Sequence, residues 1–240
     1  MQLALTVPCM IDRAMQALYL LALAPISETS ADPHSYGFRP ERATADAIEQ
    51  CFNVLSNRYA PQWILEGDIE GCFDNISHDW LVAHVPLDKA ILRKWLKAGY
   101  IENRQLFPTE TGTPQGGIIS PALSNWALDG LQKRLEQVCG KARNVDGKRI
   151  GVKMNFIRYA DDFVVLVAGT RTQAEKLRDQ VAAVLSPMGL RLSEEKTGIC
   201  HIDEGFTFLG WRIQRQTMVG TKSKRFVYTW PSKLRRLLPP

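Results

Sequence analysis

The stretch FIRYADDFVVL, residues 156–166, places two adjacent aspartates, Asp161 and Asp162, in an otherwise apolar, strand-forming run. The apolar pieces on either side, 154–160 and 163–168, predict the two strands of a β-hairpin. Two-residue hairpin turns favour glycine because both positions need positive φ, yet no glycine lies at this turn. A turn that departs from its local preference is typical of a functional site, so we expect the aspartates to act through their charge.

A third aspartate, Asp68, follows another apolar run at 63–67. Unbalanced buried carboxylates would raise their own pKa values or destabilise the hairpin, so a cation is expected beside them. Carboxylate oxygens suit Mg²⁺ or Mn²⁺ rather than zinc. If Asp68 paired beside the hairpin, the carboxylates could hold two ions about 3.5–4 Å apart, which serves in-line attack on a phosphate. A calcium loop is the alternative, but Phe73 occupies the position where such a loop needs glycine.

The chain has 240 residues and a net charge of +5, and its average composition predicts a folded protein of one or two domains. The last 29 residues contain no acidic residue and eight basic ones, namely Arg212, Arg215, Lys222, Lys224, Arg225, Lys233, Arg235 and Arg236. Such a segment suits a phosphate backbone, and the aromatic residues between these charges favour nucleic acid. A solvated surface, or acidic partners on further chain, is the alternative.

The apolar stretch 14–25 is the one feature that resembles a targeting signal. It is too short to span a bilayer and follows Asp12 and Arg13 rather than a basic leader, so a buried helix ended by Pro25 is expected. The five cysteines are scattered without a Cys-x-x-Cys pair, which predicts neither a disulfide framework nor a zinc site. We therefore expect no membrane association and a reducing compartment such as the bacterial cytoplasm.

Helices and strands are interleaved along the chain, which predicts an α+β fold in which an antiparallel sheet has helices packed on one face. Apolar periodicity predicts helices from about residue 41, over 91–96, from Ser120 to Leu135 and over 174–188, and strands over 190–193 and 206–213.

Seven blocks in one order resemble the reverse transcriptases encoded by bacterial group II introns, which combine DNA synthesis with intron maturation. The blocks are LTVPCMIDRAMQALYLLALAPISE (5–28), SYGFRPERATADAI (35–48), WILEGDIEGCFDNISHDWL (63–81), GTPQGGIISPALSNWALDGL (112–131), FIRYADDFVVL (156–166), LRLSEEKTGI (190–199) and FTFLGWRI (206–213). Such an ordered set is far more specific than any single motif.

This resemblance implies a right-hand polymerase fold. Its fingers would comprise residues 1–60 and 78–113, its palm 61–77 and 114–230, and a basic tail 231–240 would follow. No thumb is recognised after Ile213, so weak or absent activity is expected from this chain alone.

The resemblance also assigns the catalytic and metal-binding residues. Asp68 and Asp161 would hold two Mg²⁺ ions, with Mn²⁺ as a possible substitute. Asp162 would complete the acidic cluster, and the main-chain carbonyl of Ile69 would add a ligand.

Nucleotide-binding residues are implied in the same way. Arg39 and Arg42 would grip the triphosphate, although on the residues alone they are as well explained as an exposed pair at a helix start. Gln115 would contact the sugar and base of the incoming nucleotide, and Gly116 would allow close approach of the chain. Phe73 would be an aromatic gate that excludes a 2′-hydroxyl and so favours deoxynucleotides; for an isolated phenylalanine, core packing is the simpler explanation.

Lys196 would sit near the active site, with an ordinary solvated lysine as the alternative. The primer grip would be Phe208, Leu209, Gly210 and Trp211. The implied partners are an RNA template from the intron, a DNA primer and a deoxynucleoside triphosphate, while the oligomeric state stays open.

Two other functions remain open on the sequence. A CRISPR-associated or phage-defence reverse transcriptase would share the palm. A non-catalytic RNA-binding protein that assists intron splicing would keep the palm as a scaffold, and loss of an acidic residue would favour it. None of the three aspartates is lost.

Overall fold

The computed structural model describes residues 8–57, 59–102, 105–114, 116–139, 143–145, 148–150, 152–217 and 225–232. The chain divides into two compact units, which are described one at a time. Unit 1 comprises Met1–Asp32, Ile69–Gly130 and Leu185–Arg191, and unit 2 comprises Pro33–Asp68, Leu131–Val184 and Leu192–Pro240. The boundaries between fingers and palm stay a prediction.

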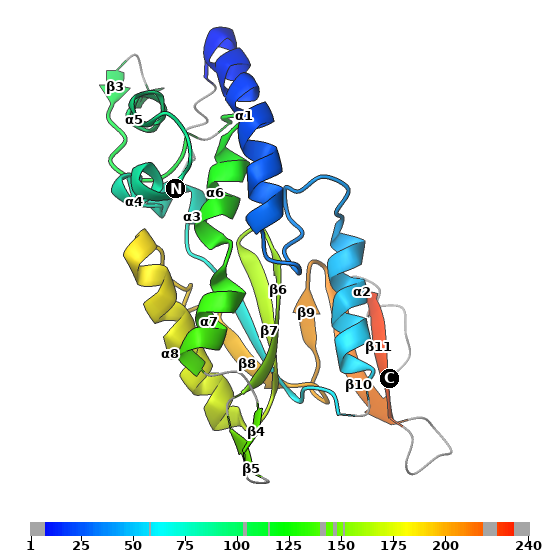
Figure 1. Cartoon of the computed structure of the whole chain (residues 1–240). Coiled ribbons are helices and arrows are strands. Elements are labelled where there is room, and N and C mark those ends of the chain that lie inside the picture. The colour runs from blue at the N-terminus through cyan, green and yellow to red at the C-terminus, as the bar shows by residue number, and fades with distance from the viewer. Residues whose placement is uncertain are drawn as a thin grey trace. The chain divides into compact units, whose positions relative to one another are not determined.

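Unit 2 is built on a four-stranded antiparallel sheet with the order β6-β7-β1-β8 (Figure 1). Its strands are β6 (Lys153–Tyr159), β7 (Asp162–Ala168), β1 (Trp63–Asp68) and β8 (Gly198–His201). The predicted hairpin is confirmed as β6 and β7, and β1 lies between β7 and β8 although it comes far earlier in the chain. Five consecutive residues of β7 are buried, because both faces of the sheet are covered.

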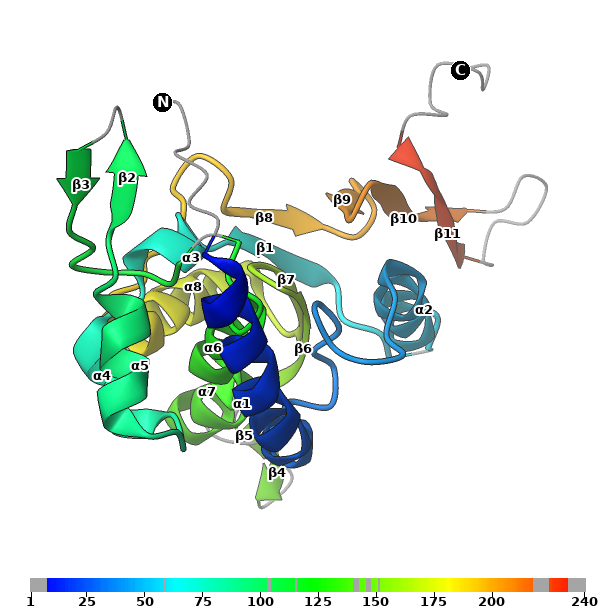
Figure 2. The ribbon, with the colours of Figure 1, turned by 90° about the horizontal axis from the view of Figure 1, so that it is seen from above.

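Side chains on one face of this sheet pack against α2 (Thr44–Leu55) and a second, three-stranded sheet. The second sheet comprises β9 (Phe206–Phe208), β10 (Trp211–Thr217) and β11 (Arg225–Pro231) in the order β11-β10-β9. Helices α7 (Leu131–Cys139) and α8 (Arg171–Leu185) lie on the other side of the four-stranded sheet (Figures 1 and 2). A short hairpin, β4 (Arg143–Val145) and β5 (Lys148–Ile150), completes the unit. The α+β class is thus confirmed.

Unit 1 is mainly helical. Its elements are α1 (Met10–Ser30), α3 (Cys72–Asn75), α4 (His78–His84), α5 (Lys89–Leu96), the hairpin β2 (Tyr100–Glu102) and β3 (Gln105–Phe107), α6 (Ser120–Leu128) and the 3₁₀ turn η1 (Ser186–Met188). Buried polar contacts link its parts, since the His78 ring nitrogen Nε2 lies 2.8 Å from the Gly112 carbonyl and the Cys72 thiol lies 3.4 Å from the Ser124 hydroxyl.

The helix expected from Ser120 to Leu135 is wrong in extent, because it is broken into α6 and α7. The break lies at Gly130, whose φ of 81° is left-handed and ends a helix. The Gly130 N–H donates to Asp32 Oδ2 at 3.0 Å, which gives this turn a fixed partner.

The buried helix ended by Pro25 is also a wrong expectation. Helix α1 continues to Ser30, since a proline removes one N–H donor and the remaining backbone bonds hold the last turn. Its buried residues are only Gln16, Leu23 and Ser27. Within the part of the chain that the structure describes, no helix is long and apolar enough to cross a membrane.

Two strand expectations need correction. Residues 190–193 form no named strand; instead the Ser193 N–H donates to the Asp68 carbonyl at 2.9 Å, and the next strand, β8, begins at Gly198. The expected strand 206–213 is split by a turn into β9 and β10. Strand β11 was not expected, and it pairs with β10 along its whole length.

Candidate active site

The turn between β6 and β7 carries the paired aspartates in a strained conformation. Tyr159 pairs with Asp162, which leaves Ala160 and Asp161 as a two-residue turn. Ala160 has a φ of 55°, a conformation that costs energy for any residue with a Cβ. The buried Arg158 side chain stabilises it, because Nη1 donates to the Ala160 carbonyl at 3.0 Å.

The SYGF segment (35–38) braces this turn from a distant part of the chain. The Tyr36 N–H donates to the Arg158 carbonyl and the Arg158 N–H donates to the His34 carbonyl, both at 2.9 Å. Gly37 lies so close that an added Cβ would stand 2.3 Å from the Ala160 nitrogen. A glycine is therefore required here, which gives the SYGF block a structural role.

The structure brings the aspartates of two distant blocks together. Asp68 is the cross-strand neighbour of Asp162, so both side chains leave the same face of the sheet. Burial, and then the negative charges of Asp161 and Asp68, raise the pKa of Asp162 to about 6. The site therefore holds more negative charge than its own surroundings neutralise.

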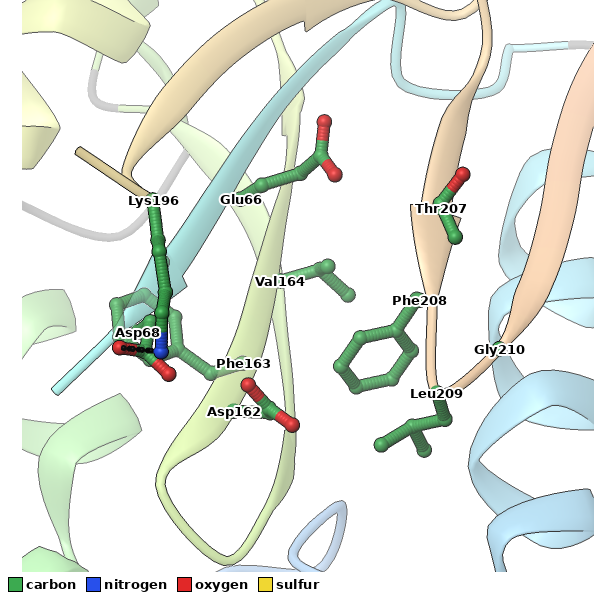
Figure 3. Close-up of a pocket in the computed structure, with 11 residues that line it drawn as sticks. Glu66, Asp68, Asp162, Phe163, Val164, Lys196, Thr207, Phe208, Leu209 and Gly210 are labelled. Atoms are coloured by element: carbon green, nitrogen blue, oxygen red, sulfur yellow. Dashed lines mark hydrogen bonds and ion pairs between the residues drawn. The ribbon is translucent and has the colours of Figure 1, made fainter. Parts of the chain in front are cut away.

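Lys196 supplies a cation at this point. Its Nζ lies 3.1 Å from Asp68 Oδ2 (Figure 3). The hydrogen bond to Asp68 raises the pKa of Lys196, which keeps the ammonium charged. The Asp68 carbonyl also anchors the segment that carries Lys196, through the Ser193 N–H.

A pocket of about 260 Å³ opens beside these side chains (Figure 3). It is lined by Glu66, Gly67, Asp68, Asp162, Phe163, Val164, Lys196, Thr207, Phe208, Leu209 and Gly210. The carboxylates lie on one side of it and strand β9 with the following turn on the other (Figure 3). All of these residues belong to unit 2.

Glu66 is a lining residue that sequence reasoning missed. Burial raises its pKa, and the Cys200 thiol donates to its Oε1 at 3.5 Å. Residues two apart on a strand share a face, so the spacing of Glu66 and Asp68 was a signal that could have found it.

The predicted primer grip forms the far side of the pocket. Leu209 and Gly210 have φ values of 49° and 80°, which makes a tight two-residue turn between β9 and β10. The Ser232 N–H donates to the Gly210 carbonyl at 2.8 Å and holds the turn. Phe208 also lines the pocket, whereas Trp211 packs against the hydrophobic core.

Arg39 and Arg42 both lie in unit 2, and their guanidinium groups contact the segment before them. Nη1 of each donates at 2.8 Å to a main-chain carbonyl, of Ser35 for Arg39 and of Pro33 for Arg42. Arg42 also stacks over the Tyr36 ring, 5.3 Å from its centroid. Neither lines the pocket.

Three further predicted residues, Ile69, Phe73 and Gly116, belong to unit 1 and are described apart from the carboxylates. The Phe73 carbonyl accepts from the Thr113 N–H at 2.6 Å, so the predicted gate and the TPQGG loop are neighbours. Gly116 is exposed with a φ of 77°. Gln115 lies outside the described residues.

The donor set fits a hard divalent cation. Among the described residues, no three His, Cys, Asp or Glu side chains converge on one point. Asp68 and Asp162 instead offer carboxylates from adjacent strands. Mg²⁺ is usually held by one or two carboxylates together with substrate phosphates and water, so this pair matches its requirements.

Comparison with known proteins agrees with this geometry. Residues 2–213 match the family described as reverse transcriptase (RNA-dependent DNA polymerase). Protein YkfC of Escherichia coli is 35% identical, over 88% of this chain and 63% of its own length. The group II intron-encoded protein LtrA of Lactococcus lactis is 28% identical, over 98% of this chain and 48% of its own length. The chain thus spans about half to two thirds of these relatives.

The fold has solved counterparts. A structure of telomerase from Candida albicans has a TM-score of 0.57 at 15% identity, and covers 85% of this chain and 36% of the telomerase chain. This likeness confirms the polymerase fold, and LtrA confirms the resemblance to group II intron proteins. Because the family match extends over most of its length, this chain belongs to the reverse transcriptase family.

Proposed function

We propose that this protein is an RNA-directed DNA polymerase of the group II intron type, which transfers nucleotides from deoxynucleoside triphosphates to a primer 3′-hydroxyl. The observation that carries the proposal is the pairing of Asp68 with Asp162 at the ends of adjacent strands, next to Asp161 and in front of a pocket. Phosphoryl transfer needs positioning and charge neutralisation above all, and this arrangement serves both.

The carboxylates are the proposed metal ligands, with the Ile69 carbonyl as an additional one. Two Mg²⁺ ions, or Mn²⁺ in their place, would acidify the primer hydroxyl and neutralise the triphosphate. Lys196 places a positive charge beside Asp68 through its 3.1 Å ion pair. The turn at Leu209 and Gly210 positions the primer end on the opposite side of the pocket.

The nucleotide is proposed to be selected by unit 1 residues and by the arginine pair. Phe73 excludes the 2′-hydroxyl, while Gln115 and Gly116 contact the sugar and base. Arg39 and Arg42 bind the triphosphate, which requires them to exchange their present carbonyl partners for phosphate oxygens.

The template is proposed to be intron RNA, and the primer DNA. LtrA is described as group II intron-encoded, and the telomerase structure contains a fragment of telomeric RNA, which supports an RNA partner for this fold. A-form RNA would be bound through its backbone and 2′-hydroxyls. Bacterial cytoplasm is the proposed location, supported by the relatives from E. coli and L. lactis.

Primer extension tests the proposal. The purified chain is given an RNA template, an annealed DNA primer, deoxynucleotides and Mg²⁺, beside Asp161→Ala and the matched control Asp179→Ala on the surface of α8. We expect weak extension by the wild type and the control, and none by Asp161→Ala.

The same samples are tested for Mg²⁺-dependent binding of the triphosphate. If the wild type neither extends a primer nor binds the triphosphate, yet binds intron RNA, the polymerase proposal fails. The non-catalytic splicing factor would then be the better explanation.

A further inference from the structure

The three-stranded sheet has one face whose composition its packing does not explain. Cross-strand pairing puts Arg212 beside Trp230, Gln214 beside Tyr228 and Gln216 beside Phe226 on this face. Side chains alternate along a strand, so Ile213 and Val227 point to the other face, where they are buried against α2.

The outward face of a half-covered antiparallel sheet is ordinarily polar. Here it carries an aromatic residue at every second position of β11. Phe226 is 45% exposed and Tyr228 is 42% exposed, while Trp230 is half-buried. Single exposed aromatics need no explanation, but three at alternate positions on one face of a strand do. We call this row, Phe226, Tyr228 and Trp230, the aromatic face.

The aromatic face is continuous with the pocket. Thr207 of β9, Arg212 of β10 and Trp230 of β11 lie side by side in one row across the sheet. Thr207 also lines the pocket, so the row runs from the pocket to the edge strand β11. Arg212 is fixed on this row because its Nη2 donates to the Glu204 carbonyl.

Charge identifies the partner. The chain contains no acidic residue after Glu204, whereas eight basic residues follow from Arg212 onward. Arg215 is neutralised by Asp203 at 2.6 Å, so the others supply the excess positive charge. A polyanion with flat, unpaired rings matches an aromatic row within a basic segment, and single-stranded nucleic acid has both properties.

We propose that the aromatic face binds single-stranded nucleic acid by stacking bases on Phe226, Tyr228 and Trp230. Alternate strand residues are about 7 Å apart, close to the length of two nucleotides at roughly 3.4 Å each. Each ring would therefore stack on every second base of the strand. This binding goes beyond nucleotide transfer, because it needs neither metal nor triphosphate and persists in Asp161→Ala.

Fluorescence anisotropy with labelled single strands of roughly twelve nucleotides tests the proposal on the full chain, without metal or triphosphate. One strand is DNA and the other RNA of the same sequence. The double variant Phe226→Ala/Tyr228→Ala should weaken binding of at least one strand about tenfold or more, since each lost stack is worth about that factor. The matched control Phe52→Ala/Tyr59→Ala removes two exposed aromatics elsewhere in unit 2 and should change affinity less than about twofold.

A second variant separates stacking from folding. Phe226→Leu/Tyr228→Leu keeps apolar side chains on β11 and should lose affinity as the alanine variant does, with an unchanged circular dichroism spectrum. The dependence of affinity on salt should stay as steep as in the wild type, because no phosphate contact is removed. Wild-type affinity of the leucine variant for both strands would overturn the proposal, as would an equal loss in the control.

Discussion

Replacing Asp162 by asparagine should stabilise the protein at neutral pH when no divalent cation is present. Asp162 lies opposite Asp68 and next to Asp161, and its pKa is raised to about 6, first by burial and then by these two charges. Asparagine keeps the shape of the side chain and removes one negative charge. The substitution therefore isolates the repulsion that a bound cation would otherwise relieve.

The sign and size of the effect follow from the pKa. An unfolded aspartate has a pKa of about 3.9, so the folded protein binds more protons than the unfolded one between about pH 4 and pH 6. The contribution of protonated Asp162 to the stability of the wild type is thus fully present below about pH 4 and is lost as the pH rises through about 6. A fully buried carboxyl would lose about 3 kcal/mol of stability, and solvent screening of this partly exposed side chain lowers the expected loss to about 1 kcal/mol.

Urea unfolding in the presence of a chelator measures this difference. At about pH 8 the free energy of unfolding of Asp162→Asn should exceed that of the wild type by about 1 kcal/mol, and at about pH 4 the two should agree. The control Asp179→Asn, at a site that is 71% exposed, should differ by less than about 0.5 kcal/mol. Excess Mg²⁺ should stabilise the wild type more than the variant. The account of a repulsive cluster would be refuted if Asp162→Asn were no more stable than the wild type at the higher pH. It would also be refuted if the gain in stability were the same at both pH values.

Three more predictions concern Gly67 and Lys196, which line the pocket, and Phe73 of unit 1. In Gly67→Ala the new Cβ would lie 2.2 Å from the Phe163 ring, so chemical denaturation should show a loss of about 1–3 kcal/mol in the free energy of unfolding. The double variant Gly67→Ala/Phe163→Leu should be more stable than the sum of the two single losses predicts, because the smaller side chain relieves the clash. Losses that simply add would contradict the clash. In Lys196→Met the pKa of Asp162 should rise further, because the positive charge of the lysine lowers it in the wild type. NMR titration of the carboxyl group measures this pKa, and an unchanged value would show that Lys196 and Asp162 do not interact. In Phe73→Val, the ratio of ribonucleotide to deoxynucleotide incorporation should increase roughly tenfold or more in single-nucleotide extension. An unchanged ratio would contradict the role of Phe73 in excluding the 2′-hydroxyl.

The features that the sequence predicted correctly have a local signal, and those it missed do not. The hairpin around Asp161 follows from apolar runs whose length and composition are those of buried strands. Strand β8 has only four residues, all of them partly or fully exposed, so no pattern distinguished it. The break at Gly130 was missed because a single glycine is tolerated inside a helical pattern, and only its left-handed φ shows that the helix ends.

Two residues with left-handed φ, Ala160 and Leu209, lie in turns that adjoin or line the pocket, and contacts outside each turn hold them. Ala160 keeps its left-handed φ because Arg158 binds its carbonyl and Gly37 leaves room beside it. Leu209 keeps its left-handed φ because the Ser232 N–H donates to the carbonyl of the next residue, Gly210, and holds the turn. Local conflict in a sequence therefore marks where a site lies, since strain persists only where tertiary structure over-determines it. Which segments supply the restraint cannot be read from local pattern, because it depends on pairings between residues far apart in the chain.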